Sequence, residues 1–435
     1  MRVAICLGVP VLLSACSSEG ANEPRNPTVI PLETDGLPDL SRSYRMTLAD
    51  MNGDGLDDLI IAHHQNPCRN PQTPEKKGCP PDGALPPFDS DGIYLGTGRG
   101  SFEYSDRLLL QKADRHGCVA ADFNADGRMD AFCGIGGDRG LATDKTDELF
   151  IAEPDGTFVD RTDEWGLNDP ARRSRLELAA DFNSDGFPDL FTTAAPPRTD
   201  GTESHSRLWL NDRGSRFVPA PSWGVDGLTT WGKLSLAGNA SVIAFDSAEN
   251  GLSAYQAIGQ RFEPIPMPAA WQGRSRQIEF ADVDDDGDPE FLVGLGEAGI
   301  GIFHPKSGGS TLLAPDVDVR DIAAGDFDGD GHIDMFVVAT GTDCKIGDVG
   351  DYGGPNPQTG QTGGISGRHV VAFGPDFSEF IPVPHPMQGC GDRAVAADTD
   401  NDGDAEVIVS QGFGRSWGPY YIVDFVTATA TASMP

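Results

Sequence analysis

The sequence predicts an all-β protein, a seven-bladed β-propeller, on three observations. A nine-residue pattern, Asp-x-Asp/Asn-x-Asp-Gly-x-x-Asp/Glu, occurs six times along the chain. Short apolar runs rich in β-branched residues follow the copies, as in Leu59–Ala62 and Met335–Ala339, and such runs are typical of strands. The spacing of the copies fits units of about 40 to 50 residues, the length of a four-stranded propeller blade, with surplus length in loops.

Each copy of the pattern has the chemistry of a loop around a hard cation such as Ca²⁺. Side-chain oxygens recur at positions 1, 3, 5 and 9, and a glycine stands at position 6, where the chain must turn sharply. The predicted ligands are Asp50, Asn52, Asp54 and Asp58; Asp122, Asn124, Asp126 and Asp130; Asp181, Asn183, Asp185 and Asp189; Asp282, Asp284, Asp286 and Glu290; Asp326, Asp328, Asp330 and Asp334; and Asp398, Asp400, Asp402 and Glu406. We expect up to six Ca²⁺ ions with a structural role.

An EF-hand is the competing interpretation of these loops. It requires a bidentate acid at position 12 and a helix on either side. Position 12 is occupied by Ile61, Cys133, Thr192, Val293, Val337 and Val409 in the six copies. None is an acid, so each cation loop is expected to connect two strands.

A seventh repeat lies in the long interval between Asp181 and Asp282. Both apolar strands recur within Lys233–Phe245, but the acidic loop is reduced to Gly238–Ala240. The chain therefore predicts seven blades, six of which carry cation loops.

The repeats resemble the FG-GAP/VCBS family, the calcium-loop propellers also found in integrin α-subunits. The resemblance is carried by the acidic loops with their Ala-Asp-Phe-Asn lead-ins and by the stretches Asn211–Phe217 and Phe158–Leu167. It covers residues from about 28 to about 426. It implies a seven-bladed propeller with Ca²⁺ in strand-connecting loops on one face, and it does not imply a single activity.

The two ends of the chain are expected to complete one blade. The last repeat supplies three strands, near 393–397, 406–410 and 420–425. The segment Thr28–Leu32 can supply the fourth strand and so cover two sheet edges. The propeller domain then spans residues 28–435.

The N-terminus resembles a bacterial lipoprotein signal at residues 1–15. An apolar run, Val3–Leu13, is too short to span a bilayer and leads to Leu13-Ser-Ala-Cys16. The resemblance implies cleavage before Cys16 and lipid on its sulfur, while an ordinary cleaved signal is the alternative. Residues 16–27 then form a flexible tether. We expect a cell-envelope protein, with Ser17 favouring the outer membrane, on its periplasmic or surface side.

The cysteines fit an oxidising compartment. Without Cys6 in the signal and Cys16 on lipid, an even set of six remains. The expected disulfides are Cys68–Cys79, Cys118–Cys133 and Cys344–Cys390. Metal binding by these thiols is the alternative, although no Cys-x-x-Cys pair supports it.

The acidic composition limits the partners. The chain has 67 Asp and Glu residues against 32 Lys and Arg residues, a formal net charge of −35. Such a surface repels nucleic acid and anionic lipid. We expect no nucleic-acid partner, contact with a membrane only through the N-terminal lipid, and a monomer.

Basic residues recur just before the loops. Each precedes a first loop aspartate by a similar distance: Arg45, Arg115, His116, Arg175, Arg276, Arg320 and Arg393, with Lys233 in the blade that lacks a cation loop. We expect them to begin the innermost strands, at the mouth of the axial channel opposite the cation loops. They could form a basic collar for an anionic ligand such as an acidic sugar. The alternative is that each pairs with a neighbouring acid such as Asp321 or Asp392 and orients packing.

Two functions follow. The favoured one is a non-enzymatic binding or adhesion module for a protein or glycan ligand. The other is a calcium-propeller enzyme acting on polysaccharides, such as a lyase, for which His63, His64 or His116 would have to converge with arginines in one cleft. No hydrolase, metalloprotease or phosphate-binding motif is present, and no catalytic residue is assigned.

Overall fold

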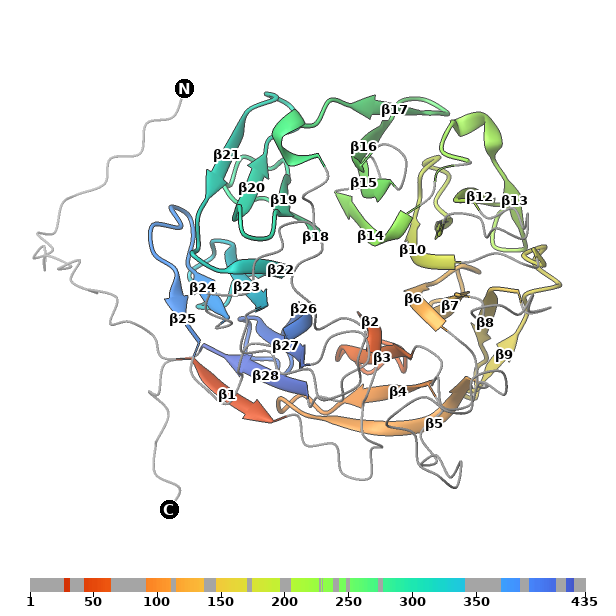
Figure 1. Ribbon diagram of the computed structural model, residues 1–435. Helices are drawn as coiled ribbons and strands as arrows, with labels where there is room; N and C mark the ends of the chain where they lie inside the picture. The colour runs from red at the N-terminus through yellow and green to blue at the C-terminus, as the bar shows by residue number, and fades with distance from the viewer. Residues whose placement is uncertain are drawn as a thin grey trace, which may run out of the picture.

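The computed structural model describes residues 27–31, 43–63, 91–110, 115–136, 146–169, 174–195, 205–226, 228, 230–237, 242–247, 251–272, 277–340, 369–383, 391–411 and 420–425. These residues form seven four-stranded antiparallel sheets around a central axis (Figure 1). The prediction of a seven-bladed β-propeller is thus confirmed.

The blades follow one another along the chain. Blade 1 contains β2 (Ser43–Ala49), β3 (Asp58–His63), β4 (Asp91–Gly96) and β5 (Phe102–Leu110); blade 2 contains β6 (Arg115–Ala121), β7 (Asp130–Ile135), β8 (Glu148–Ala152) and β9 (Phe158–Asp160); blade 3 contains β10 (Ser174–Ala180), β11 (Asp189–Ala194), β12 (Arg207–Asn211) and β13 (Phe217–Pro219). Blade 4 contains β14 (Thr230–Ala237), β15 (Val242–Ser247), β16 (Gly251–Ala257) and β17 (Phe262–Ile265); blade 5 contains β18 (Gln277–Ala281), β19 (Glu290–Gly294), β20 (Ile300–Phe303) and β21 (Ser310–Leu313). Blade 6 contains β22 (Asp318–Gly325), β23 (Asp334–Thr340), β24 (Val370–Ala372) and β25 (Ile381–Pro382); blade 7 contains β26 (Gly391–Ala397), β27 (Glu406–Gln411), β28 (Tyr420–Asp424) and β1 (Thr28–Pro31).

The first strand of the chain closes the ring. β1 is the outermost strand of blade 7 and pairs antiparallel with β28, with Thr28 opposite Asp424 and Pro31 opposite Tyr421. At the axis, the inner strands β2, β6, β10, β14, β18, β22 and β26 each contact the next, and β26 contacts β2. The expected closure by the N-terminal strand is therefore confirmed.

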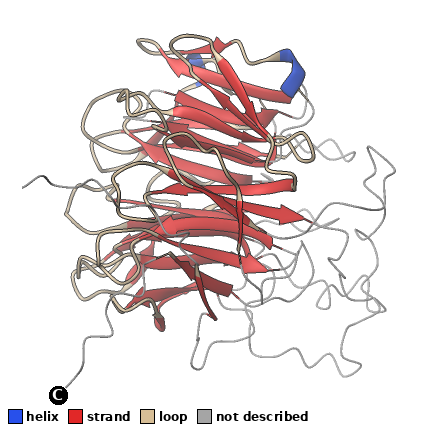
Figure 2. Cartoon of the chain, turned by 90° about the vertical axis from the view of Figure 1, so that its left-hand side faces the viewer, coloured by secondary structure: helices blue, strands red, loops and turns tan. Residues whose placement is uncertain are grey.

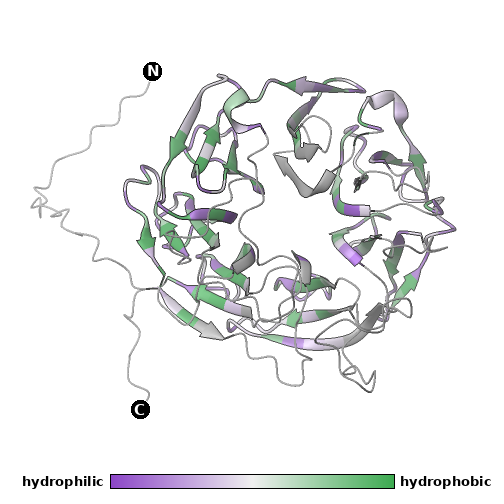
Figure 3. Cartoon of the chain, viewed as in Figure 1, coloured by the Kyte–Doolittle hydropathy of each residue, from purple (hydrophilic) through white to green (hydrophobic). Residues whose placement is uncertain are grey.

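The hydrophobic core is divided among the blade interfaces. Seven clusters of buried residues occupy the seven contacts between neighbouring blades. In β3, Leu59 and Ile61 pack against blade 7, while Ile60 and Ala62 pack against blade 2. Both faces of such a strand are buried, which explains its continuous apolar sequence. Figure 3 shows this hydrophobic character along the strands of the blades.

Within the described residues, the 3₁₀ helices η2 (Pro221–Trp223) and η3 (Ala269–Trp271) supplement the core, and they follow the outer strands of blades 3 and 4. Trp271 packs across Gly301 of β20, where a Cβ atom would lie 2.5 Å from the indole ring. Glycine is therefore required at position 301. Within the described part of the chain, no helix has the length and apolarity needed to cross a membrane.

The six cation loops each join the first and second strands of a blade. They lie on one side of the disc, which we call the loop face. Figure 2 shows the molecule edge-on, with the described loops gathered along one side of the strands. The inner strands begin on the opposite face. The signal at 1–15, Cys16, most of the tether, Arg276 and the expected pairs Cys68–Cys79 and Cys344–Cys390 lie outside the described residues.

Candidate functional site: the cation loops and the loop face

The first aspartate of each loop organises the backbone. In blade 2, the Asp126 N–H donates to Asp122 Oδ1 at 3.0 Å, and the Gly127 N–H donates to Asp122 Oδ2 at 2.8 Å. The same two bonds recur in the other five loops. The carboxylate at position 1 thus fixes the turn of the backbone through hydrogen bonds that do not depend on a cation.

Two positions of each loop adopt a left-handed backbone. Position 6 is always glycine, with φ of 84° at Gly127. Position 4 also has positive φ, at 58° in Ala125, 61° in Ser184 and 63° in Asn401. Sequence reasoning anticipated only position 6, because side chains at position 4 vary and two of the six loops place glycine there. A non-glycine residue at such φ is strained, and the bonds to position 1 hold it there.

The carboxylate at position 9 joins three segments. Asp130 is fully buried; its Oδ2 accepts the Phe123 N–H of its own loop at 3.0 Å, and its Oδ1 accepts the N–H of Ala152, the last residue of β8, at 2.8 Å. Burial raises the pKa of Asp130 to about 7, against the two backbone hydrogen bonds that lower it. Equivalent pairs of bonds occur in blades 1, 3 and 6, at Asp58, Asp189 and Asp334.

Position 2 anchors the loop in the core. Met51, Phe123, Phe182, Val283 and Phe327 are buried, and each packs between two neighbouring blades. Sequence reasoning missed this role, although an apolar residue at position 2 in five of six loops was a usable signal. Any change in a loop is thereby coupled to a blade interface.

The donor atoms can surround a metal ion. Three sets of carboxylates have ligand oxygens within 4.8 Å of one another: Asp282, Asp284 and Asp286; Asp326, Asp328 and Asp334; and Asp398, Asp400 and Glu406. Asp400 adds an independent indication, since its Oδ1 is buried and has no hydrogen-bond partner among the described residues. A buried carboxylate oxygen without a donor is costly unless a cation compensates it. These residues therefore fit a divalent cation.

The loops of blades 1 to 3 differ from this pattern at position 3. Asn52 accepts the Asp54 N–H through Oδ1 at 2.8 Å and donates Nδ2 to Asp54 Oδ2 at 2.9 Å. Similar bonds join Asn124 to Asp126 and Asn183 to Asp185. These loops carry one negative charge fewer at position 3 than those of blades 5 to 7.

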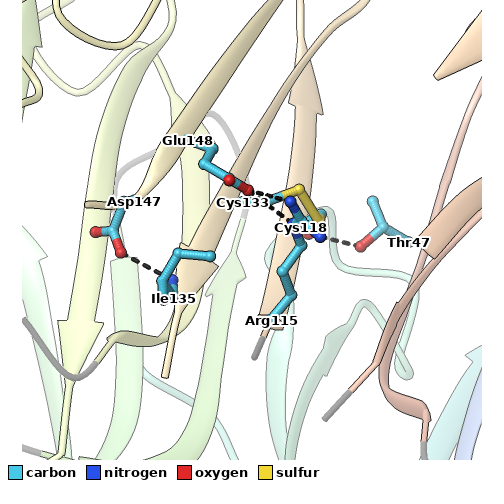
Figure 4. Close-up of a disulfide and its surroundings, with 7 residues drawn as sticks. All are labelled: Thr47, Arg115, Cys118, Cys133, Ile135, Asp147 and Glu148. Carbon is cyan, nitrogen blue, oxygen red and sulfur yellow. Dashed lines mark hydrogen bonds and ion pairs between the residues drawn. A yellow bond between two sulfur atoms is a disulfide. The ribbon is translucent and has the colours of Figure 1, made fainter. Parts of the chain in front are cut away.

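Acidic residues lie near several members of the predicted basic collar that the structure describes. Arg115 is fully buried and paired with Glu148 of β8, beside the Cys118–Cys133 disulfide, whose sulfurs are 2.08 Å apart (Figure 4). Arg175 donates to Gly136 and Ser174 carbonyls and lies 2.6 Å from His116 Nδ1. His116 and Arg175 are both buried, so they offer no open catalytic cleft.

Arg45 and Arg393, also on inner strands, have polar and charged neighbours. Arg393 donates Nη1 to Gln277 Oε1 at 3.1 Å, and Asp321 Oδ2 accepts the Ala394 N–H at 3.0 Å. Burial lowers the pKa of Arg45, opposed by the charge of Glu177, and burial raises the pKa of Asp321 to about 6.

Glu177, Glu279 and Asp321 of the inner strands lie close enough to Arg45 to affect its pKa electrostatically. Of the predicted collar residues, Arg115 is paired with an acid, Glu148, and the role of the set as a ligand face stays a prediction. The inner strands carry β-bulges close to these residues, with register shifts at Ser43/Arg45, Arg115/Gly117 and Val319/Asp321. The side chains of His63 and Lys233, and His64 as a whole, are outside the described residues.

A pocket of about 400 Å³ opens on the loop face between blades 1 and 2. Ile93, Leu95, Met129 and Phe158 contribute apolar lining. The charged lining consists of Asp50 and Asp122 of the two cation loops, Glu153, Asp155 and one cation, Arg128, which is paired with Asp126. The Thr157 hydroxyl, donating to Asp155 Oδ1 at 2.6 Å, holds the pKa of that exposed carboxyl below its usual range. The pocket lies opposite the face where the sequence had placed the ligand.

Comparisons with solved structures bear on the fold. A crystal structure of BBS1N in complex with ARL6DN, soaked with lead, has a TM-score of 0.53 and 11% identity, and the match covers 93% of this chain and 99% of that one. YCF48 bound to D1 peptide has a TM-score of 0.52 and 9% identity, covering 95% of this chain and 98% of that one. No protein-family model and no curated protein matches the sequence. At such identities the likeness shows the propeller fold alone.

Proposed function

We propose that this protein is a calcium-stabilised binding module that holds a segment of a partner protein in the pocket between blades 1 and 2. The observation that carries this proposal is the pocket itself, which combines an apolar wall with a carboxylate rim on the loop face. Apolar pockets with a few convergent polar groups are the usual form of binding sites. Loops on a rigid scaffold are also where contacts to partners are commonly built.

The structural neighbours support a binding role by analogy. One is described in complex with ARL6DN and the other bound to D1 peptide. Propellers are a shared scaffold for many functions, so this supports the class of function and not the identity of the partner.

The loops favour Ca²⁺ over Mg²⁺. Each offers side-chain oxygens from four residues, and the acids of position 9 are buried carboxylates whose ionised form needs compensation. Ca²⁺ accepts six to eight oxygen ligands in irregular geometry, whereas Mg²⁺ demands a near-ideal octahedron and retains water. At a free concentration ten times the dissociation constant, each ion would stabilise the folded chain by about 1.4 kcal/mol.

The pocket's chemistry suggests an apolar side chain flanked by a basic one. Met129 and Phe158 present apolar surface, and Asp155 is an exposed carboxylate at the rim. Ca²⁺ in the loops of blades 1 and 2 would neutralise Asp50 and Asp122 and leave Asp155 to attract a cation. The chain's net charge of −35 would also favour a basic partner.

Display on the cell envelope is part of the proposal. The signal-like residues 1–15 and Cys16 would place lipid at the N-terminus, with residues 16–27 as a tether. Radiolabelled palmitate incorporation into the full chain, and its loss in Cys16→Ser, is the direct measurement. Equal labelling of both proteins would contradict the anchor.

Selection of random peptides on the Ca²⁺-loaded protein tests the pocket. We expect enriched peptides to contain an apolar residue beside Lys or Arg, and to bind Met129→Arg at least tenfold more weakly, equivalent to about 1.4 kcal/mol. Ile333→Arg is the matched control, because Ile333 occupies the same loop position in blade 6, away from the pocket. Equal affinity for wild type and Met129→Arg, measured by fluorescence anisotropy, would place binding elsewhere.

A further inference from the structure

The loop of blade 5 differs from the others in one ligand. His304 follows β20 and turns its imidazole towards the loop: Nδ1 lies 3.2 Å from Glu290 Oε1 and 3.5 Å from Asp284 Oδ2. One ligand atom from each of these three residues lies within 4.8 Å of the other two. No other set of this kind within the described residues includes a histidine.

The sequence of blade 5 explains why the histidine is there. The residue directly after each loop, at position 10, pairs with a residue of the third strand. In blades 1, 2, 3 and 6, the residue two positions after that partner donates its backbone N–H to the acid at position 9. The donors are Gly96, Ala152, Asn211 and Gly374. In blade 5, Phe291 pairs with Phe303, so the equivalent residue is Pro305. Proline has no N–H. One oxygen of Glu290 therefore lacks its usual backbone donor and faces His304 instead.

We propose that His304, Asp284 and Glu290 form a separate site for a borderline divalent cation such as Zn²⁺. Zinc bonds to histidine nitrogen and carboxylate oxygen are about 2.0 to 2.2 Å long, which in a tetrahedron separates neighbouring donors by roughly 3.3 to 3.6 Å. The separation of 3.5 Å from Nδ1 to Asp284 Oδ2 falls in this range, and the separation of 3.2 Å from Nδ1 to Glu290 Oε1 is about 0.1 Å shorter than its lower end. Imidazole suits Zn²⁺ or Co²⁺, whereas Ca²⁺ selects oxygen ligands.

The surroundings orient the three donors. Glu290 is almost fully buried, and its Oε2 accepts the Val283 N–H at 3.0 Å, which fixes the carboxylate. The turn carrying His304 is closed by two backbone bonds, from the His304 N–H to Gly309 O at 3.0 Å and from the Gly308 N–H to His304 O at 2.9 Å. Such outer contacts orient metal ligands and raise affinity.

Asp284 belongs to both sites. It stands in the set Asp282, Asp284 and Asp286 and in the set with His304. One carboxylate can bridge two cations through its two oxygens. His304 is only partly exposed, at 29%, so a position on the solvent side of the bound ion is left to water. Blade 5 is thus a paired site, with an oxygen-rich position for Ca²⁺ and a histidine-containing position for Zn²⁺.

Metal titration of the full chain tests this site. The protein is stripped of metals, its thiols are blocked with iodoacetamide, excess Ca²⁺ is restored, and Zn²⁺ is then titrated by isothermal calorimetry. We expect one Zn²⁺ per chain, and a loss of at least about a hundredfold in affinity in His304→Ala with the Ca²⁺ content unchanged. Co²⁺ absorption bands typical of nitrogen ligation should disappear in the same variant.

His332→Ala is the matched control. His332 Nδ1 lies 2.6 Å from Asp285 Oδ2 on the same face, where a single carboxylate meets a histidine without a third ligand. Its Zn²⁺ affinity should equal that of the wild type. Zinc binding that survives in His304→Ala, that is lost in His332→Ala, or that is absent in the wild type would overturn the proposal. Peptide binding in the pocket of blades 1 and 2 is independent of each outcome.

Discussion

At the scale of single residues, the acids of each loop divide between two roles, supporting the backbone and binding a cation. The acidic sequence pattern alone did not distinguish these roles. Position 1 bonds to the backbone within the loop. Position 9 is buried and bonds to the backbone of its own loop and of the third strand of the blade. Asp126 at position 5 is exposed and faces the solvent side. Position 9 should therefore support the fold even without a cation, and position 5 should matter mainly when one is bound.

Asp130→Ala tests this separation in EDTA. Removing the side chain leaves the Phe123 and Ala152 N–H groups buried without an acceptor, at about 1 to 3 kcal/mol each. We expect the free energy of unfolding, from urea denaturation, to fall by about 2 to 6 kcal/mol. Asp126→Ala is the control and should cost under about 1 kcal/mol in EDTA. Equal losses in the two variants would contradict the assignment.

Titration of His369 makes the free energy of unfolding depend on pH. The residue is fully buried, its Nδ1 accepts the Ala339 N–H at 3.1 Å, and burial lowers its pKa to about 4. In the unfolded chain the pKa is about 6.5. Between these values the unfolded chain binds a proton that the folded chain does not, so stability is complete above pH 6.5 and falls as the pH decreases towards 4.

His369→Asn should flatten this profile, because the amide oxygen can accept the Ala339 N–H but cannot titrate. The difference between the wild-type and variant profiles should reach at most about 3 kcal/mol across this pH range. His205→Asn, near the surface beside Arg207, is the control. Urea denaturation at a series of pH values makes the comparison. Parallel profiles for wild type and His369→Asn would show that His369 is not the source of the pH dependence.

At the scale of elements, the unit is the inner hairpin with its loop. β6 and β7 pair with Cys118 opposite Cys133, and the disulfide joins them on either side of the second loop. The Cys118 carbonyl also accepts the Thr47 hydroxyl of blade 1 at 2.7 Å. The β6–β7 hairpin is thus cross-linked by its disulfide and hydrogen-bonded to blade 1.

Reduction of this disulfide should destabilise the protein without unfolding it. The bridge closes a segment with a sequence separation of 15, for which loop-closure entropy gives about 3 kcal/mol. The comparison is the denaturation midpoint of the wild type with and without reductant. Cys118→Ala/Cys133→Ala is the control and should show no reductant effect at this hairpin. A midpoint that does not respond to reductant in the wild type would contradict the prediction.

The hairpins also show what could be predicted from sequence. Strand positions, the metal-free blade 4 and the pairing partner of β1 followed from repeats and apolar runs, because burial on both faces leaves a continuous pattern. Side-chain directions at the inner strands did not follow. The bulge at Arg115/Gly117 directs Arg115 to Glu148, and no local pattern encodes that turn. His304 was missed because it lies outside its loop in sequence and reaches it only through β19–β20 pairing.

At the scale of the whole molecule, stability depends on a closed ring. Seven interfaces each hold one apolar cluster, and β1 completes the blade on which two of them depend. Without β1, the outer edge of β28 would lose its partner and expose backbone donors and acceptors. The ring is therefore expected to lose cooperativity when the N-terminal strand is removed.

A chain beginning at residue 32 should melt at least about 5 °C below one beginning at residue 27, given about 2 to 4 °C per kcal/mol for large domains. It should also self-associate through the exposed edge of β28. Both are measured together, by calorimetry and by size-exclusion chromatography with light scattering. The chain beginning at residue 27 is the control, since it retains β1 and lacks only the preceding residues. Identical melting of the two chains would show that β1 does not contribute to closure.

The central claim is that six loops on one face bind cations that stabilise the ring. The most direct measurement is the number of Ca²⁺ ions per chain, determined by native mass spectrometry on the metal-stripped protein titrated with Ca²⁺. We expect saturation at six, a rise in melting temperature over the same titration, and five ions in Asp126→Ala. Saturation at none, or an unchanged count in Asp126→Ala, would contradict it.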